Sequence, residues 1–124
     1  MEKFPHAKIL VIDDEKALLK LFHRILTEFD FFVDMVESAE EGIKKIHFTT
    51  YDLILTDIKL PGMTGNDFFD YVKDNVRHSI PIVAMSGTPW LLENSSFDAV
   101  VAKPFSKEDL LSVIRQFIRP LQLQ

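Results

Sequence analysis

Apolar and polar positions follow two different periods along this chain, and each change of period marks a change of predicted element. Short segments of four to six mostly apolar residues, typical of buried strands, occupy residues 7–12, 32–36, 53–56, 80–85 and 99–102. Between them, apolar residues such as Leu18, Phe22 and Ile25 recur every three or four positions, which is the spacing of an amphipathic helix. The order predicts strands and helices that alternate along the chain.

Hydroxyl residues mark the starts of three of the predicted helices. Ser38 and Ser106 each precede an acidic residue by three positions, the spacing of a capping box. Thr64 is placed to cap a helix over residues 66–76. These caps separate the helices from the strands that precede them.

Three of the strands, those containing Ile9, Leu53 and Ile82, are apolar on both faces. Central strands of a parallel sheet have this composition because helices cover both sides of the sheet. The length of 124 residues allows one domain with a single core. We therefore predict an α/β fold, a doubly wound parallel sheet, in a single domain over residues 1–124.

Five polar side chains stand where predicted strands end. They are Asp13 and Asp14 after the first strand, Asp57 after the third, Ser86 after the fourth and Lys103 after the fifth. In an open, doubly wound sheet, binding sites form outside the carboxyl ends of the strands. We therefore expect these five side chains to form one site.

Taken singly, each of these residues has an ordinary structural explanation. Asp13 or Asp14 can cap the following helix, Ser86 can bond its own backbone, and Lys103 can lie in solvent. Three carboxylates at ~5 Å, however, would repel by on the order of 3 kcal/mol per pair at an effective dielectric of 20. Capping does not require that cost, so the cluster with Asp57 favours metal binding.

Composition narrows the classes of partner. The net charge is -5, and no run of Lys or Arg is longer than the pair Lys44 and Lys45, so we expect neither nucleic acid nor anionic membrane as a direct partner. The first residues lack the apolar stretch of a signal peptide, and no later run is long enough to span a bilayer. We expect a cytoplasmic protein. The absence of cysteine removes disulfides and thiolate chemistry.

The polar residues, in this order and at these spacings, resemble the receiver domain of bacterial two-component response regulators of the chemotaxis-regulator type. The matching segments are Ile12-Asp13-Asp14, Leu55-Thr56-Asp57 with Pro61-Gly62, Ala84-Met85-Ser86-Gly87 and Ala102-Lys103-Pro104-Phe105. The resemblance covers nearly the whole chain. It implies a flavodoxin-like, five-stranded parallel sheet in the order 2-1-3-4-5 with five helices, and a cis peptide bond before Pro104.

The resemblance also implies a phosphoryl-transfer site. Asp57 would be the phosphoacceptor, taking a phosphoryl group from a sensor histidine kinase or a histidine phosphotransfer protein. Ser86 would donate a hydrogen bond to a phosphoryl oxygen. Lys103, together with Mg²⁺, would supply positive charge to the transition state. Such a domain transfers a phosphoryl group only to and from itself, so it is not an enzyme in the usual sense.

A magnesium site belongs to the same resemblance. Asp14, Asp57 and the backbone carbonyl of Lys59 would hold Mg²⁺, and Asp13 would reach the ion through water or support its ligands. The resemblance further implies a downstream target and allows a homodimer, without identifying either the target or the cognate kinase.

Two positions depart from the family pattern. Receiver domains usually carry Tyr or Phe three residues before the site lysine, and this chain has Val100. Ser86 and Lys103 are seventeen residues apart, about one helical turn fewer than is usual in the family. We therefore expect the fourth helix, near residues 89–92, to be short or irregular.

Three interpretations remain open from the sequence. The first is an active receiver that is switched by phosphorylation of Asp57. The second is a haloacid-dehalogenase-type phosphatase, although that class carries its nucleophile on the first strand in an Asp-x-Asp pattern, and here the strand ends Asp13-Asp14-Glu15. The third is a phosphorylation-independent interaction module, favoured by Val100 and the short fourth helix but opposed by the complete acidic site.

Overall fold

The computed structural model describes residues 2–92 and 95–121, which form five strands, four α-helices and one short 3-10 helix. The strands are β1 (Lys8–Ile12), β2 (Phe32–Val36), β3 (Leu53–Asp57), β4 (Ile82–Ser86) and β5 (Ala99–Ala102). The helices are α1 (Lys16–Glu28), α2 (Ala39–Phe48), α3 (Gly65–Asn75) and α4 (Lys107–Ile114), and the 3-10 helix is Pro89–Leu92. Among these residues, no helix combines the length and the apolar content that crossing a bilayer requires.

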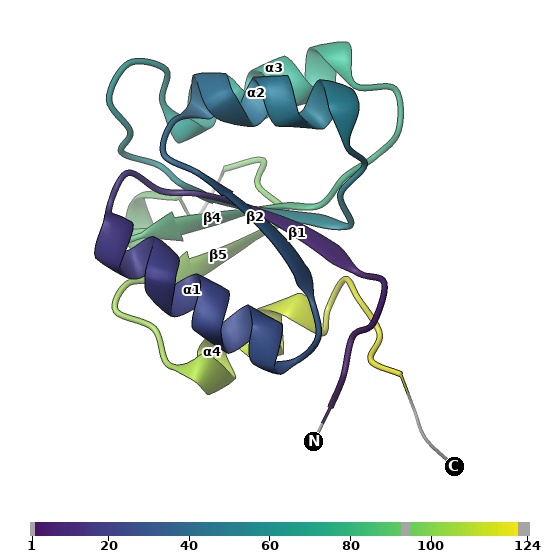
Figure 1. Cartoon of the computed structure of the whole chain (residues 1–124). Coiled ribbons are helices and arrows are strands. Elements are labelled where there is room, and N and C mark those ends of the chain that lie inside the picture. The colour runs from purple at the N-terminus through teal and green to yellow at the C-terminus, as the bar shows by residue number, and fades with distance from the viewer. Residues whose placement is uncertain (1, 93–94, 122–124) are drawn as a thin grey trace.

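The five strands form one parallel sheet in the order β2-β1-β3-β4-β5, which confirms the predicted fold. Helices α2 and α3 cover one face of the sheet, and α1 and α4 cover the other (Figure 1). The carboxyl ends of all five strands therefore point toward the same edge of the molecule.

Each central strand contributes side chains to two cores. On β1, Ile9 and Val11 pack on the side of α1 and α4, whereas Leu10 and Ile12 pack on the side of α2 and α3. All four are fully buried. This two-sided burial is the physical reason for the continuous apolar runs in the sequence.

The predicted helix caps are present, with one difference. Complete capping boxes join Thr64 to Asp67 at α3 and Ser106 to Asp109 at α4. The Ser38 hydroxyl accepts a hydrogen bond from the Glu41 N–H, but the Glu41 carboxylate accepts from the Glu37 N–H instead of closing the box with Ser38. Glu41 therefore bonds the backbone of the segment that leaves β2.

The connection between β4 and β5 departs from the five helices that the family resemblance implied. Its helical part in the described residues is the single 3-10 turn Pro89–Leu92, which confirms the expectation of a short or irregular fourth helix. The physical reason is the short link, because the chain must also cross to the start of β5 within it. The Lys103-Pro104 peptide bond is cis, as expected.

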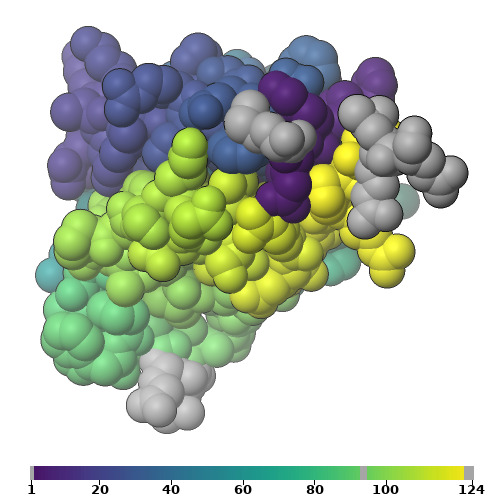
Figure 2. Space-filling view, turned by 90° about the horizontal axis from the view of Figure 1, so that it is seen from below, coloured from purple at the N-terminus to yellow at the C-terminus, as the bar shows by residue number. Residues whose placement is uncertain are grey.

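The two terminal segments close the core on the side of α1 and α4, where Figure 2 shows them in contact. The Leu121 N–H donates to the Lys3 carbonyl oxygen at 2.8 Å, and the Arg115 guanidinium pairs with the Glu2 carboxylate. Phe4 belongs to this core, stacks on Phe31 and is 1% exposed. The N-terminal segment thus seals one end of this core.

Replacement of the α4 cap tests the contribution of local sequence to this fold. Ser106→Ala should lower the free energy of unfolding by about 1 kcal/mol, because the Asp109 N–H loses its acceptor. Urea denaturation measures the change. Ser112→Ala, an exposed position within the same helix, is the matched control and should change stability by no more than a few tenths of a kcal/mol. Equal effects of the two substitutions would contradict this role for Ser106.

Candidate functional site

The five polar residues predicted from the strand ends converge at one edge of the sheet. Asp57 and Ser86 are the last residues of β3 and β4, and Lys103 follows β5. Together with Asp14 they line a cavity of about 380 Å³. Asp13 follows β1 and is fully buried beside it. The expected grouping is therefore correct.

The three carboxylates form a compact oxygen cluster. Asp13, Asp14 and Asp57 each offer an oxygen atom within 4.8 Å of the others. Asp13 is buried, Asp14 is exposed, and Asp57 is 8% exposed. A cluster of hard oxygen ligands that is open on one side suits Mg²⁺, which keeps part of its water shell when it binds protein. The residues present therefore fit the magnesium ion that the sequence led us to expect.

Lys103 joins the two buried carboxylates. Its Nζ atom lies 3.0 Å from Asp13 Oδ2 and 3.3 Å from Asp57 Oδ2. Burial alone would lower the pKa of Lys103, but the hydrogen bond and the charge of Asp13, followed by the charge of Asp57, raise it above its ordinary value. Lys103 is therefore a firmly charged ammonium group. The sequence predicted its place in the site but not its contact with Asp13.

The Asp57 carboxyl has a pKa above its ordinary value. Burial is the main cause, because it disfavours the charged form, and the nearby Asp13 charge acts in the same direction. The Lys103 ammonium and the Lys59 backbone N–H oppose this rise. Asp57 thus lies in an environment that leaves its negative charge only partly compensated by protein groups.

Asp13 has a second contact, which bears on whether its role is to cap the helix that follows it. Its Oδ1 atom accepts a hydrogen bond from the Glu15 N–H at 2.9 Å. Glu15 is the N-cap residue of α1 and makes no capping bond with its own side chain. Asp13 therefore orders the turn into α1 while its other oxygen contacts Lys103, so its structural role and its place in the site coexist.

Ser86 is held by a residue that the sequence reasoning did not include in the site. The Thr88 N–H donates to Ser86 Oγ at 3.0 Å, and the two hydroxyl oxygens lie 3.3 Å apart. The Ser86 carbonyl oxygen also accepts from the Lys103 N–H at 2.8 Å. The only sequence signal for Thr88 was that it is a hydroxyl residue two positions after Ser86.

Gly65 is a second residue that the sequence reasoning missed. A Cβ atom at this position would lie 2.4 Å from the Asp57 carbonyl oxygen, which is closer than atoms can approach. Gly65 is the first residue of α3, and its N–H donates to the Ile58 carbonyl oxygen at 3.0 Å. The glycine therefore lets α3 begin directly against the Asp57 backbone. The signal was its position next to the predicted cap, Thr64.

Two further positions singled out in the sequence are Lys59 and Val100, of which only Lys59 lines the cavity. Lys59 is exposed and lines the same cavity. Val100, which stands where an aromatic residue is usual, is half-buried on β5 and lines a separate groove with Ser112 and Val113 of α4. No aromatic side chain at position 100 can therefore move behind Ser86.

Solved structures with this fold are numerous. The chemotaxis response regulator CheY4 of Vibrio cholerae aligns with a TM-score of 0.84 and 23% identity, over 90% of this chain and 98% of that one. The response regulator TrrA of Thermotoga maritima, solved in complex with Mg²⁺ and BeF, aligns with a TM-score of 0.82 and 25% identity, over 90% of this chain and 99% of that one.

Similar sequences belong to longer regulators. The response regulator ArlR of Staphylococcus saprophyticus is 32% identical over 115 residues, which are 90% of this chain and 52% of that protein. The transcriptional regulatory protein ResD of Bacillus subtilis is 26% identical over 96% of this chain and 51% of its own length. The chain thus spans about half the length of these two curated relatives.

The family model of the response regulator receiver domain matches residues 9–115, from β1 to the end of α4. That family is a signalling domain, so the interpretation as a haloacid-dehalogenase-type phosphatase is wrong. A match over this much of the chain, with the acidic cluster and Lys103 at the strand ends, shows that the chain belongs to the response regulator receiver family.

Proposed function

We propose that residues 1–124 form one phosphoacceptor receiver domain in which Asp57 takes the phosphoryl group. The observation that carries this proposal is the position of Asp57. It is the only one of the three clustered carboxylates that both ends a central strand and contacts Lys103 from within the cavity. A phosphoryl group bonded to its oxygen would lie between Lys103 and Ser86.

The acidic cluster supports our choice of metal ligands. Asp14 and Asp57, with the backbone carbonyl of Lys59, would hold Mg²⁺, and Asp13 would reach the ion through water or support its ligands. Bound there, Mg²⁺ would supply positive charge that stabilises the transferring phosphoryl group. The Mg²⁺–BeF complex of TrrA, a protein 25% identical to this chain, supports the assignment.

The reaction follows from the positions of the side chains. A carboxylate oxygen of Asp57 attacks the phosphorus of a phosphohistidine, the new O–P bond forms as the N–P bond breaks, and the imidazole nitrogen keeps the electron pair. Lys103 remains bonded to Asp13 and neutralises a phosphoryl oxygen. Ser86 Oγ accepts from Thr88 and so keeps its own proton to donate to the phosphoryl group.

The partner is a histidine kinase or a histidine phosphotransfer protein. An apolar groove beside Lys103, of about 350 Å³, is lined by Leu18 and Leu21 of α1 and by Pro104 and Phe105. We infer that the partner docks its apolar surface here, because the groove opens next to the cavity that holds Asp57. Since such partners act in the cytoplasm, we infer the same compartment for this chain.

A second candidate function rests on the β4–β5 connection. The single 3-10 turn and Val100 remove the usual aromatic route from the site to β5. A receiver scaffold of this kind could bind its target without phosphorylation. Covalent labelling of Asp57 by a small phosphodonor distinguishes the two functions.

Asp57→Asn should abolish covalent phosphorylation, because an amide is a poor nucleophile toward phosphorus. Intact mass spectrometry after incubation with acetyl phosphate and Mg²⁺ measures one added phosphoryl group on the wild type and none on the variant. Asp70→Asn, an exposed position on α3, is the control and should be labelled like the wild type. Undiminished labelling of Asp57→Asn would refute its assignment, and an unlabelled wild type would favour the second candidate.

Asp14→Asn should weaken stabilisation by Mg²⁺. The ion binds the folded state alone, so it raises the melting temperature of the wild type by mass action. Without Mg²⁺, the variant should melt above the wild type, because one of three close carboxylate charges is removed. Thermal unfolding with and without Mg²⁺ measures both effects, with Asp70→Asn as the control. Equal Mg²⁺ stabilisation of Asp14→Asn and the wild type would show that Asp14 is not a ligand.

Asp57→Asn should also change how stability depends on pH in the absence of Mg²⁺. The pKa of Asp57 is raised in the folded state, so the folded protein binds this proton more tightly than the unfolded chain does. Stability therefore falls as pH rises from the ordinary carboxyl pKa through the raised one. The variant should be more stable than the wild type at neutral pH and lose that advantage at acidic pH. An advantage that does not vary with pH in thermal unfolding would contradict this linkage.

A further inference from the structure

Among residues 2–92 and 95–121, no strand pairs with the outer side of β2, which forms one edge of the sheet. The Phe32 N–H donates to the Ala7 carbonyl oxygen at 2.9 Å, and the Val36 carbonyl oxygen accepts from the Asp13 N–H at 3.1 Å, so these two residues face β1. Because backbone groups alternate along a strand, those of Val33 and Met35 point outward. The described part of this edge carries no proline or lysine, and its pairing with β1 runs without a bulge. This edge therefore lacks the usual features that prevent an exposed strand from pairing with a strand of another chain.

Asp34 carries the single charge on β2, but its side chain does not protect the strand edge against pairing. The Asp34 carboxylate accepts a hydrogen bond from the Tyr51 hydroxyl at 2.6 Å. Tyr51 is 3% exposed and belongs to the core beneath α2. The carboxylate is therefore tied to the protein's own interior and does not guard the edge.

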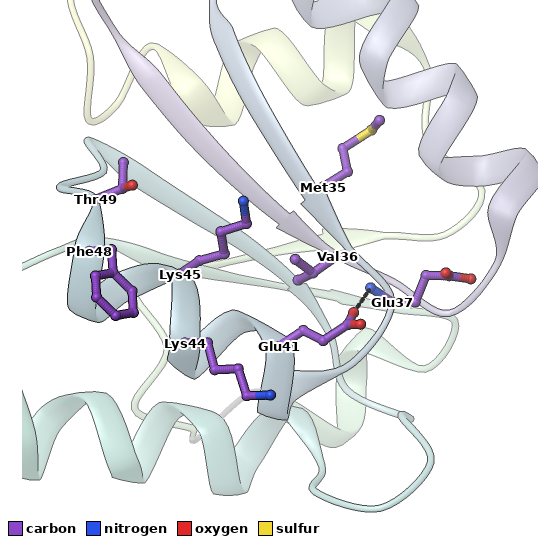
Figure 3. Close-up of a pocket in the computed structure, with 8 residues that line it drawn as sticks. All are labelled: Met35, Val36, Glu37, Glu41, Lys44, Lys45, Phe48 and Thr49. Atoms are coloured by element: carbon purple, nitrogen blue, oxygen red, sulfur yellow. Dashed lines mark hydrogen bonds between the residues drawn. The ribbon is translucent and has the colours of Figure 1, made fainter.

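A groove of about 580 Å³ lies between this edge and α2, as Figure 3 shows. Met35 and Val36 line it from β2, and Phe48 lines it from the end of α2. Phe48 is 89% exposed, the highest exposure of any large apolar side chain in the described residues, and Phe32 at the start of β2 is also exposed. Apolar surface of this kind next to an open strand favours a protein partner.

The same groove carries two acidic and two basic side chains, Glu37, Glu41, Lys44 and Lys45. Glutamate four residues before lysine usually forms an ion pair on a helix, but the Glu41 carboxylate instead accepts from the Glu37 N–H at 3.0 Å. None of the ion pairs found among the described residues includes any of these four side chains. In Figure 3 the Glu41 carboxylate lies at the Glu37 backbone nitrogen, the Glu37 side chain extends away from Glu41, and Lys45 points toward β2.

We propose that this edge, made of the β2 strand and the outer face of α2, binds a second copy of the chain about a two-fold axis. In an antiparallel pair of α2 helices, the acidic N-terminal half of one lies beside the basic C-terminal half of the other. Glu37 and Glu41 of each copy then face Lys44 and Lys45 of its partner, so the surface complements itself. A parallel arrangement would place like charges together. The contact also covers Phe48 and brings the open β2 edges side by side.

Charge-reversal variants test this arrangement directly. The acidic variant is Lys44→Glu with Lys45→Glu. The basic variant is Glu37→Lys with Glu41→Gln, in which the glutamine keeps an acceptor for the backbone N–H at position 37. Sedimentation equilibrium of the unphosphorylated chain at low ionic strength should show a dimer for the wild type and monomers for each variant alone. An equimolar mixture of the two variants should restore the dimer, because both pairs of facing charges are then opposite.

A control variant carries the same change of charge on a different surface. Lys20→Glu with Arg24→Glu makes the same change in net charge as the acidic variant on exposed positions of α1, which covers the other face of the sheet, and should remain dimeric. A wild type that stays monomeric would overturn the proposal. Freely exchanging Val33 and Met35 amide protons in that monomer would show that the β2 edge remains available to an extended segment of another protein. A dimer that persists in both variants would also overturn it, by placing the contact elsewhere.

Discussion

Asp13 and Asp57 are buried carboxylates that share one ammonium group, that of Lys103, while Asp14 adds a third negative charge within 4.8 Å. One cation among three carboxylates leaves the site with uncompensated negative charge, and the pKa of Asp57 is raised mainly by burial and further by the Asp13 charge. The fold must hold these groups together against their repulsion. It does so by ending the parallel strands β1, β3 and β5 at one edge of the sheet, so that separating the charges would disrupt the two cores.

The same constraint explains why the site suits a divalent cation and a phosphoryl group. An ion with two positive charges would relieve the repulsion, and in the proposed function a phosphoryl group on Asp57 would have Lys103 and Ser86 as further partners. Contacts between uncharged groups position the backbone around Asp57 and the hydroxyl of Ser86. Gly65 lets α3 begin against the Asp57 carbonyl group, and Thr88 positions the Ser86 hydroxyl.

The site and the proposed dimer edge are at different places on one sheet. The site uses the carboxyl ends of the strands, where backbone geometry exposes polar residues, whereas the dimer edge uses the unpaired side of β2. Glu37, which follows β2 at its carboxyl end, lines the groove but not the cavity at Asp57. The β5 side, with Val100 and a single 3-10 turn, differs from the usual family pattern. A regulator whose β5 route is altered can still associate through the opposite edge.

The sequence by itself determined the elements, the order of the sheet through its family resemblance, and the five polar residues of the site. Period and hydrophobicity are local properties, and two-sided burial leaves an unmistakable continuous apolar run, as at Ile9 to Ile12. Placing Asp57 and Lys103 together required only the rule that parallel strands end at one edge. Cap residues were likewise correct at Thr64 and Ser106, because capping depends on residues three positions apart.

Only the tertiary structure decided which of these groups touch. The contact of Lys103 with Asp13 joins residues ninety positions apart, and no local pattern encodes it. The close approach of Gly65 to the Asp57 carbonyl depends on how α3 packs at the end of β3. Glu41 bonds the Glu37 backbone instead of Ser38 or Lys45 because the chain turns there from β2 into α2. Such choices among several available partners depend on distances between elements, which local sequence patterns leave undetermined.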